Sequence, residues 1–378
     1  MIRRVALTVA APVAATVLAV VVSSLVLVVS GSNPLDAYAN MWEYGTRLET
    51  LVDTLNRATP LYISGVAAAI GFRMNLFNIG VEGQYVIAAF FAAHVGGHIA
   101  LWAPLHVTVI LVVAMTVGAL WGAIPGVLKV TRGVNEVIST IMLNTIAVAG
   151  VVAFLLPRWQ QKDDTLNTAT KTIPESGRMP DLNSWLELVT REIGKGRELT
   201  GVLLVAVAVG VAYHLFINRT RVGFDFRATG WNPFAARASG VPEKRTIVLA
   251  MVLSGLVAGL VGMPDILSDK FKYDQAFVQG LGFAGIGVAL LGRNHPAGIA
   301  VGALLFAFLD ASAVVLDVKG DASREIVIIM QGVILLSAVV AYEVVRRVRQ
   351  RDEARAAAAA LANAGAGADT VSTAEVAR

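Results

Sequence analysis

Ten stretches of the chain are apolar over lengths that allow them to enter or cross a lipid bilayer, and they limit the possible folds more than any other feature. A helix that crosses the roughly 30 Å hydrocarbon core needs about 20 apolar residues. Of the 378 residues, 56% are hydrophobic and only 15% are charged, which is too apolar for a water-soluble domain of this length. We therefore predict an all-α polytopic membrane protein. The expected spans are residues 5–29, 59–72, 84–101, 107–130, 137–156, 201–217, 246–267, 276–291, 297–316 and 326–345.

The distribution of Lys and Arg between these spans predicts the orientation of the chain. Short cytoplasmic loops carry an excess of basic residues, whereas long loops cross the membrane regardless of charge. With a cytoplasmic N-terminus, 18 of the 31 basic residues lie inside, and the short loops divide 18 to 6 when the long stretch 157–200 is set aside. This asymmetry favours ten spans with both termini cytoplasmic. The basic residues do not gather on one face, so the net charge of +4 does not indicate nucleic-acid binding.

Three hydrophilic segments accompany a membrane domain that covers residues 1–345. Residues 158–198 form the only sizeable polar insert, which we expect to be external, with a short amphipathic helix at 185–193. Residues 218–245 form the longest internal cytoplasmic loop. Residues 346–378 begin with basic residues and become rich in Ala and Gly, so we expect a short helical extension followed by disorder.

The second expected span is short and leads into a polar segment. Its 14 or so strongly apolar residues would extend only about 21 Å as a helix, so a broken helix is expected. The segment that follows, FNIGVEGQ, places Asn78, Glu82 and Gln84 between apolar runs. Ionisable groups at such a depth line a pathway or pair with a partner. Both interpretations stay open: these side chains line a substrate pathway, or they tie neighbouring helices together.

A second polar cluster leads into the fifth span. Glu136, Thr140 and Asn144 recur every four residues and therefore share one helical face, and Ser139 lies beside them. Such a face either points into a pathway or bonds one helix to another. The same two alternatives apply to Asp310 in the ninth span.

Small-residue patterns predict how the helices pack. Overlapping G-x-x-x-G steps at 118–126 and another at 255–259 indicate helices whose backbones approach closely. A weak internal similarity relates SGVAA at 64–68 to SGLVA at 254–258, in spans that run in opposite directions in the predicted topology. This is the pattern expected of an inverted repeat of spans 2–5 and 7–10.

The sequence argues against several classes of function. It has no cysteine, and its five histidines lack metal-ligand spacing, so no metal site is expected. No G-x-x-x-x-G-K-[ST] motif occurs, and the G-x-G-x-x-G match at 280–285 lies in an apolar span without a preceding strand. Neither ATP nor a dinucleotide is therefore expected on this chain. No nucleophile–base pair supports a membrane enzyme.

The cytoplasmic loop contains the signals of a short helix. Asn232 is suited to the N-cap, Pro233 to the first helical position and Gly240 to the C-terminal stop, which predicts a helix at 233–239. A basic loop with such a helix either docks on a soluble partner or only enforces the topology.

Four strings of the sequence together resemble a known family. They are FNIGVEGQ at 77–84, RGVNEVISTIMLN at 132–144, GWNPFAARASG at 230–240 and GIGVALLGRNHPAGI at 285–299. They are similar to permease subunits of ABC importers for nucleosides, a subgroup of the larger permease family for simple sugars and branched-chain amino acids. The resemblance runs in order from about residue 33 to residue 345.

The resemblance implies a transport subunit of the bacterial cytoplasmic membrane, with no enzymatic activity and no cofactor of its own. Two permease subunits, identical or related, would pair around a central pathway, two separate ATPase domains would bind ATP, and an external lipid-anchored binding protein would deliver the substrate. The resemblance assigns the pathway to Asn78, Glu82 and Gln84 and, less fully, to Glu136, Ser139 and Asn144. It assigns the ATPase contact, as a coupling helix, to Trp231, Asn232, Pro233, Ala235, Ala236 and Gly240.

The expected mechanism is alternating access driven by the ATPase. The nearest alternative is a simple-sugar permease of the same family, although FNIGVEGQ favours a nucleoside. A stand-alone secondary transporter is a further alternative, and it would leave the loop helix without a docking role. The insert at 158–198 departs from the family pattern, so the docking surface for the binding protein is not defined by the resemblance.

Overall fold

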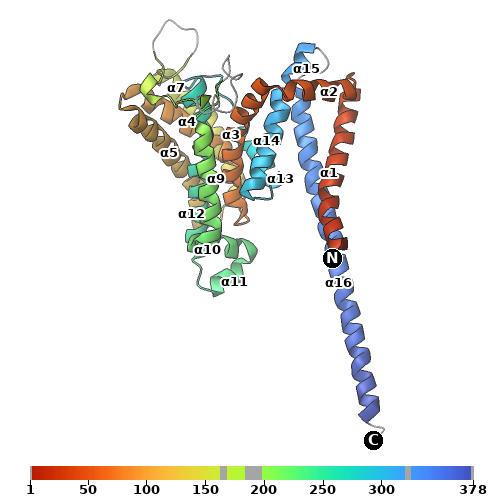
Figure 1. Ribbon diagram of the computed structural model, residues 1–378. Coiled ribbons are helices and arrows are strands. Elements are labelled where there is room, and N and C mark those ends of the chain that lie inside the picture. Colours follow the sequence, from red (N-terminus) through yellow and green to blue (C-terminus); the bar gives the residue numbers. More distant parts are fainter. Residues whose placement is uncertain (1, 162–167, 184–197, 320–324, 376–378) are drawn as a thin grey trace. The chain divides into compact units, whose positions relative to one another are not determined.

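The computed structural model describes residues 2–161, 168–183, 198–319 and 325–375, most of which are helical (Figure 1). Within these ranges the β pairing is limited to two isolated bridges, Ala169 with Asp274 and Asp181 with Thr200. The predicted all-α class is confirmed. The described elements are α1 (Ile2–Val29), α2 (Pro34–Gly45), α3 (Leu48–Phe72), α4 (Val81–His98), α5 (Ala103–Arg132), α6 (Glu136–Thr145), η1 (Ile146–Val152), α7 (Ala153–Trp159), η2 (Glu175–Gly177), α9 (Val202–Arg219), α10 (Arg221–Trp231), α11 (Pro233–Ala238), α12 (Glu243–Ala258), η3 (Asp265–Asp269), α13 (Leu281–Leu291), α14 (Pro296–Ser312), α15 (Val314–Lys319) and α16 (Glu325–Glu375).

A helix overlaps every one of the ten predicted spans. Among the described residues, five helical stretches are long and apolar enough to cross a membrane alone, or six if a bent pair of helices is counted as one span. The chain is therefore a multi-pass membrane protein. The total of ten spans and the cytoplasmic location of both termini stay predictions. The five stretches are Ala103–Arg132, Glu136–Trp159, Val202–Arg219, Pro296–Lys319 and Glu325–Val348.

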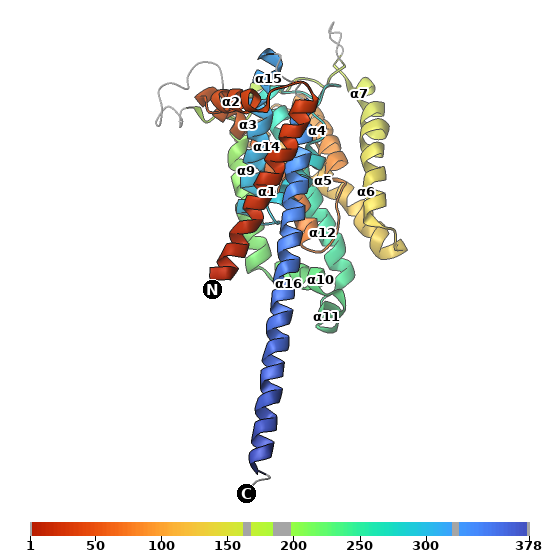
Figure 2. The same ribbon diagram turned by 90° about the vertical axis from the view of Figure 1, so that its right-hand side faces the viewer.

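The chain divides into two compact units. The first unit combines Met1–Pro34 with Ile328–Arg378, and in it α1 lies beside the first part of α16 (Figures 1 and 2). On α1, the small residues Ala15, Ala19 and Ser23 are buried at a spacing of four, which is typical of a helix that another helix approaches closely. The second unit is Leu35–Val327 and contains the remaining helices.

Helix α16 extends into the C-terminal tail, for which a short helical extension followed by disorder was expected. Helix α16 continues to Glu375 and so includes most of the predicted tail, 346–378. Five consecutive alanines, 356–360, lie in this part, and alanine has the highest helix propensity of the amino acids.

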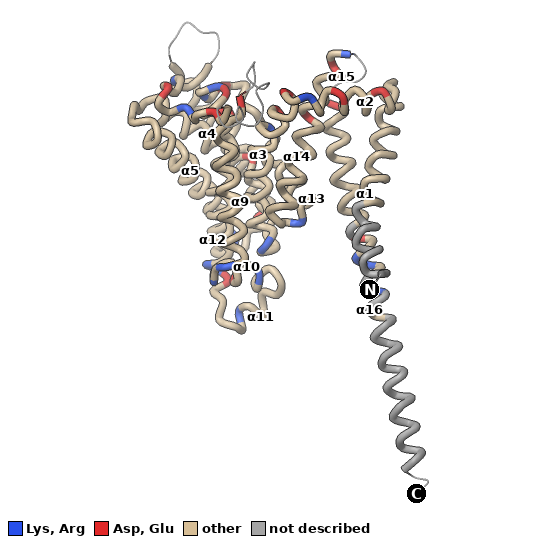
Figure 3. Tube along the Cα trace, viewed as in Figure 1, with Lys and Arg blue, Asp and Glu red and all other residues tan. Residues whose placement is uncertain are grey.

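Charged residues are concentrated toward the two ends of the second unit (Figure 3). Helices α10 and α11 lie at one end, and α7 with the described part of the polar insert lies at the other (Figure 1). Helix α3 connects the two ends. Near its start, Asn56 donates to the backbone oxygen of Glu198 at 2.8 Å, whereas Arg73 at its C-terminal end touches Gly230 of α10. The insert and the loop 218–245 therefore lie at opposite ends, as the predicted topology requires.

Helix α3 corrects the expectation of a short second span. It has 25 residues and begins at Leu48 instead of residue 59, which gives a continuous length of about 37 Å. The break lies after Phe72, between α3 and α4. Polar residues in the first half of α3 have partners within the protein: Arg57 forms an ion pair with Asp310 of α14, and Asn56 bonds the segment before α9. A scan for apolar residues cannot detect such a start.

The glycine patterns mark close contacts between helices, as predicted. At Gly118 and Gly122, the backbone of α5 lies against that of α12 at Gly255, with no room for a side chain between them. Helix α14 packs in turn against α3, where Gly65 faces Ile299. Span 4 thus packs on span 7, and span 9 packs on span 2. In the predicted inverted repeat, spans 2 and 4 of the first half correspond to spans 7 and 9 of the second. The two contacts, 4 on 7 and 9 on 2, are therefore equivalent, as such a repeat would require.

The described part of the polar insert is a strap across the end of the second unit. Backbone amides of residues 170, 173 and 179 donate to carbonyls of Tyr273, Phe271 and Leu267 at 2.8–2.9 Å. The ring of His106, at the start of α5, bonds Ser176 of the strap at 2.9 Å. The amphipathic helix expected at 185–193 lies outside the described residues.

Candidate functional site

Two amide side chains join at the turn between α3 and α4. The side-chain nitrogen of Asn78 donates to Gln84 at 3.0 Å and to the Ser254 hydroxyl of α12 at 2.8 Å. Its side-chain oxygen accepts from the Gly80 amide at 3.0 Å and from Gln84 at 3.1 Å. Ser254 in turn donates to the backbone oxygen of Ala67 on α3 at 2.6 Å. These buried groups therefore hold α3, α4 and α12 together.

Glu82 binds the N-terminus of α13. The carboxylate is 5% exposed and accepts from the amides of Gly280 at 2.6 Å and Gly282 at 2.8 Å, and from the Tyr85 hydroxyl at 3.1 Å. The first amides of a helix lack intrahelical partners and lie at the positive end of its dipole, so a carboxylate there is stabilising. Gly280, which has a φ of +94°, makes the turn into α13. A residue of the first predicted repeat thus caps a helix of the second.

Asn144 connects α6 to the same turn. Its side-chain oxygen accepts from the Gly83 amide at 2.9 Å, and its nitrogen donates to the Ile79 carbonyl at 2.9 Å. We call Asn78, Glu82, Gln84, Asn144 and Ser254 the polar node.

Glu136 and Ser139 lie on the buried side of α6, toward its start. Glu136 forms an ion pair with Lys129 of α5, with side-chain exposures of 9% and 29%. The Ser139 hydroxyl donates to the Glu136 carbonyl within α6 at 3.2 Å. Glu136, Thr140 and Asn144 are all buried, which confirms that they share an inward face.

The structure thus brings four of the six predicted pathway residues into the polar node, and it gives the other two partners in α5 and α6. The sequence did not reveal Ser254 or the amides of Gly280 and Gly282 as members of this network. A signal for Ser254 was present, because it lies in the SGLVA string of the internal similarity. The glycines of 280–285 gave no sign in the sequence that Glu82 was their partner.

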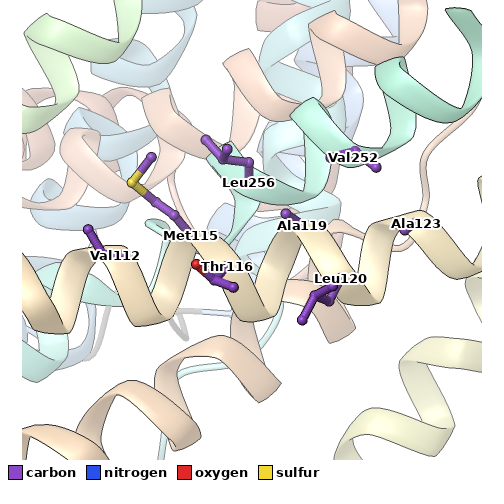
Figure 4. A pocket seen from close by; sticks show the side chains of 8 residues that line it. All are labelled: Val112, Met115, Thr116, Ala119, Leu120, Ala123, Val252 and Leu256. Atoms are coloured by element: carbon purple, nitrogen blue, oxygen red, sulfur yellow. The ribbon is translucent and has the colours of Figure 1, made fainter.

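A shallow groove of about 280 Å³ lies between α5 and α12 (Figure 4). Thr116 is the only lining residue with a polar side chain, so the groove offers few hydrogen-bond partners and contains none of the predicted pathway residues. The groove is lined by Val112, Met115, Thr116, Ala119, Leu120, Ala123, Val252 and Leu256.

The loop helix forms as its capping signals predict. In α11, the Asn232 side chain accepts from the amides of Phe234 at 3.0 Å and Ala235 at 3.1 Å. Gly240 has a φ of +83°, a left-handed conformation that glycine adopts at little cost. An ion pair between Arg237 and Glu243 joins this turn to α12.

Trp231, at the end of α10, and Phe234, within α11, are the most exposed aromatic side chains of this loop. Trp231 is 92% exposed and Phe234 is 79% exposed, whereas Ala236 is 4% exposed and anchors α11 against the protein. Pro233, Ala235 and Gly240 are also exposed. Adjacent exposed aromatic side chains on a charged end of a protein are typical of a binding surface.

Comparisons with known proteins agree on one family. The family model described as "Branched-chain amino acid transport system / permease component" matches residues 50–339. The guanosine ABC transporter permease protein NupP of Bacillus subtilis (strain 168) is 32% identical over 340 residues, which are 88% of this chain and 93% of the relative. The glucose ABC transporter permease protein TsgB13 of Haloferax volcanii is 30% identical over 87% of each chain. The nucleoside ABC transporter permease protein NupB of Lactococcus lactis subsp. cremoris is 30% identical over 87% of this chain and 90% of the relative.

Proposed function

The chain belongs to the family of branched-chain amino acid transport system permease components, and from this premise we propose that it is the permease subunit of an ATP-driven importer of nucleosides. Two of the three relatives described above are named for guanosine or for nucleosides. Their names support a nucleoside as the substrate of this chain. We propose the bacterial cytoplasmic membrane as its location.

The exposed face of α11 is the observation that carries the proposal. An importer whose membrane subunit lacks an ATPase must contact one through a cytoplasmic surface. Trp231 and Phe234 offer exposed aromatic area, and the Asn232 cap and the buried Ala236 fix the helix that presents them. In the proposal, Trp231, Asn232, Pro233, Ala235, Ala236 and Gly240 form or shape the surface on which the ATPase docks.

We place the substrate pathway beside the polar node, between this chain and a second permease subunit. Asn78, Glu82, Gln84 and Asn144 use their hydrogen bonds within the protein, so their proposed role is to fix the helix ends that border the pathway. Glu136 and Ser139 would do the same at the start of α6. Movement of these helix ends would open the pathway to one side of the membrane at a time.

A sugar is the second candidate substrate, because a relative named as a glucose permease is as similar to this chain as one named for nucleosides. Uptake into proteoliposomes that contain the permease with its candidate ATPase and binding-protein partners would separate the two. Labelled guanosine should enter only with ATP, and excess unlabelled nucleosides should suppress its entry while excess glucose should not. Suppression by glucose, or ATP-driven uptake of glucose alone, would replace the nucleoside with a sugar.

A further inference from the structure

Arg73 joins three helical elements at the end of the second unit that carries α11. It follows the last residue of α3 and is half-buried. Its guanidinium donates to the Asn294 carbonyl at 2.8 Å and to the Tyr213 hydroxyl of α9 at 3.3 Å. Tyr213 donates to the same carbonyl at 2.9 Å. Asn294 belongs to the tight turn between α13 and α14, so one arginine holds α3, α9 and that turn together.

The backbone of Arg73 also contacts the end of α10. Gly230, the residue before Trp231, lies so close to the Arg73 carbonyl that a Cβ at position 230 would overlap it. The same Cβ would lie 3.0 Å from the Cα of Met74. The segment that leads into α11 therefore rests directly on the end of α3. Helix α11 follows α10 and packs on it, so a movement of α11 that carries α10 along must move or separate this contact.

Helix α13 is bonded at both of its ends to the segment that contains Arg73. Its N-terminal amides bind Glu82, and the turn after its C-terminus binds the Arg73 guanidinium. Between Arg73 and the polar node the chain is compact, because the Leu76 amide donates to the Gly71 carbonyl at 3.0 Å. A displacement of the segment that contains Arg73 would therefore act on both ends of α13.

We infer that Arg73 is the positioning residue that transmits movement of α11 to α13 and the polar node. The inference rests on the proposed function, because it takes α11 to be the surface that the ATPase moves. It adds a residue that the family resemblance does not assign, at a contact between the loop and the helix bundle.

The test compares transport with ATP hydrolysis in the reconstituted complex. Arg73→Gln keeps a polar side chain but loses the charge and the several N–H donors of the guanidinium. Arg73→Lys keeps the charge. Tyr213→Phe removes only the hydroxyl that bonds Arg73 and Asn294. Arg351→Ala changes an exposed arginine of α16, in the first unit, and is the matched control. The measured quantities are ATP hydrolysis, guanosine uptake and the recovery of intact complex.

The inference predicts intact complexes that still hydrolyse ATP but import fewer guanosine molecules per ATP. For Arg73→Gln the ratio should fall by roughly 5- to 150-fold, the usual range of coupling between sites. The ratio should fall less in Tyr213→Phe and in Arg73→Lys, and in Arg351→Ala it should match the wild type. An unchanged ratio in Arg73→Gln or, if that variant does not assemble, in Tyr213→Phe overturns the inference while the proposed function stands. A wild-type complex that shows no ATP-driven uptake overturns the proposed function itself.

Discussion

Replacing Glu82 by alanine should destabilise the second unit more than any other single change at the polar node. The substitution removes the acceptor of the Gly280 and Gly282 amides, which lie 2.6 and 2.8 Å from the carboxylate. An unsatisfied buried donor costs about 1–3 kcal/mol. Gly282 is buried and Gly280 only partly buried, so the two amides together give a loss of up to about 6 kcal/mol. The Tyr85 hydroxyl adds little to this sum, because it keeps its bond to the Val278 carbonyl at 2.9 Å.

Glu82→Gln separates hydrogen bonding from simple loss of packing. Glutamine has nearly the same shape but offers one acceptor oxygen, so it should satisfy one amide and lose about 1–3 kcal/mol. The expected order of stability is wild type, then glutamine, then alanine. Glu175→Ala, at an exposed residue of η2, is the control and should change stability by less than about 0.5 kcal/mol.

Unfolding of the purified permease in mixed micelles, followed by circular dichroism as the fraction of denaturing detergent rises, measures these differences. Glu82→Ala should lose its helix signal at the lowest detergent fraction, Glu82→Gln at a higher fraction and the wild type at the highest. If Glu82→Ala unfolds at the same detergent fraction as Glu175→Ala, the carboxylate does not hold α13, and the account of the node is wrong.

Two further predictions use the same unfolding assay. Asn144→Leu removes the acceptor of the Gly83 amide and the donor to the Ile79 carbonyl, so stability should fall by about 1–3 kcal/mol, and a loss below about 0.5 kcal/mol would show that α6 is not bonded to the turn. Gly255→Ala forces a methyl group against the Gly118 backbone and should lower stability by about 1–3 kcal/mol or more. Gly332→Ala is the control: Gly332 has open space around it, so this change should be neutral or stabilising. Equal effects of the two substitutions would contradict the close packing of α5 on α12.

Local signals in the sequence were sufficient for the helices and their caps. Apolar runs predicted where helices form, because a membrane helix satisfies its backbone within one continuous segment. The Asn232 cap of α11 depends on residues two and three positions away, so it could be predicted from a short string. The inward face of α6 followed from the four-residue spacing of Glu136, Thr140 and Asn144.

The start of α3 and the role of Glu82 could not be predicted from local patterns, because both depend on partners distant in sequence. The early start of α3 depends on Arg57 and Asp310, which are 253 residues apart, and the role of Glu82 depends on amides about 200 residues away. A short string gives the charge of each residue but not its partner. For this reason the sequence left open whether the polar residues tie helices together, and the structure gives each of them a bonding partner.

The central claim is that this permease works with an ATPase through α11, and nucleoside-stimulated ATP hydrolysis by the complex in lipid tests it most directly. Nucleosides should stimulate hydrolysis with the wild-type chain, and both this stimulation and ATPase capture should be lost with Trp231→Ala or Phe234→Ala. Trp102→Ala, a comparably exposed tryptophan ahead of α5, should still capture the ATPase. Failure of the wild-type chain to bind any ATPase, together with uptake by this chain alone driven by an ion gradient, would contradict the claim and identify a secondary transporter.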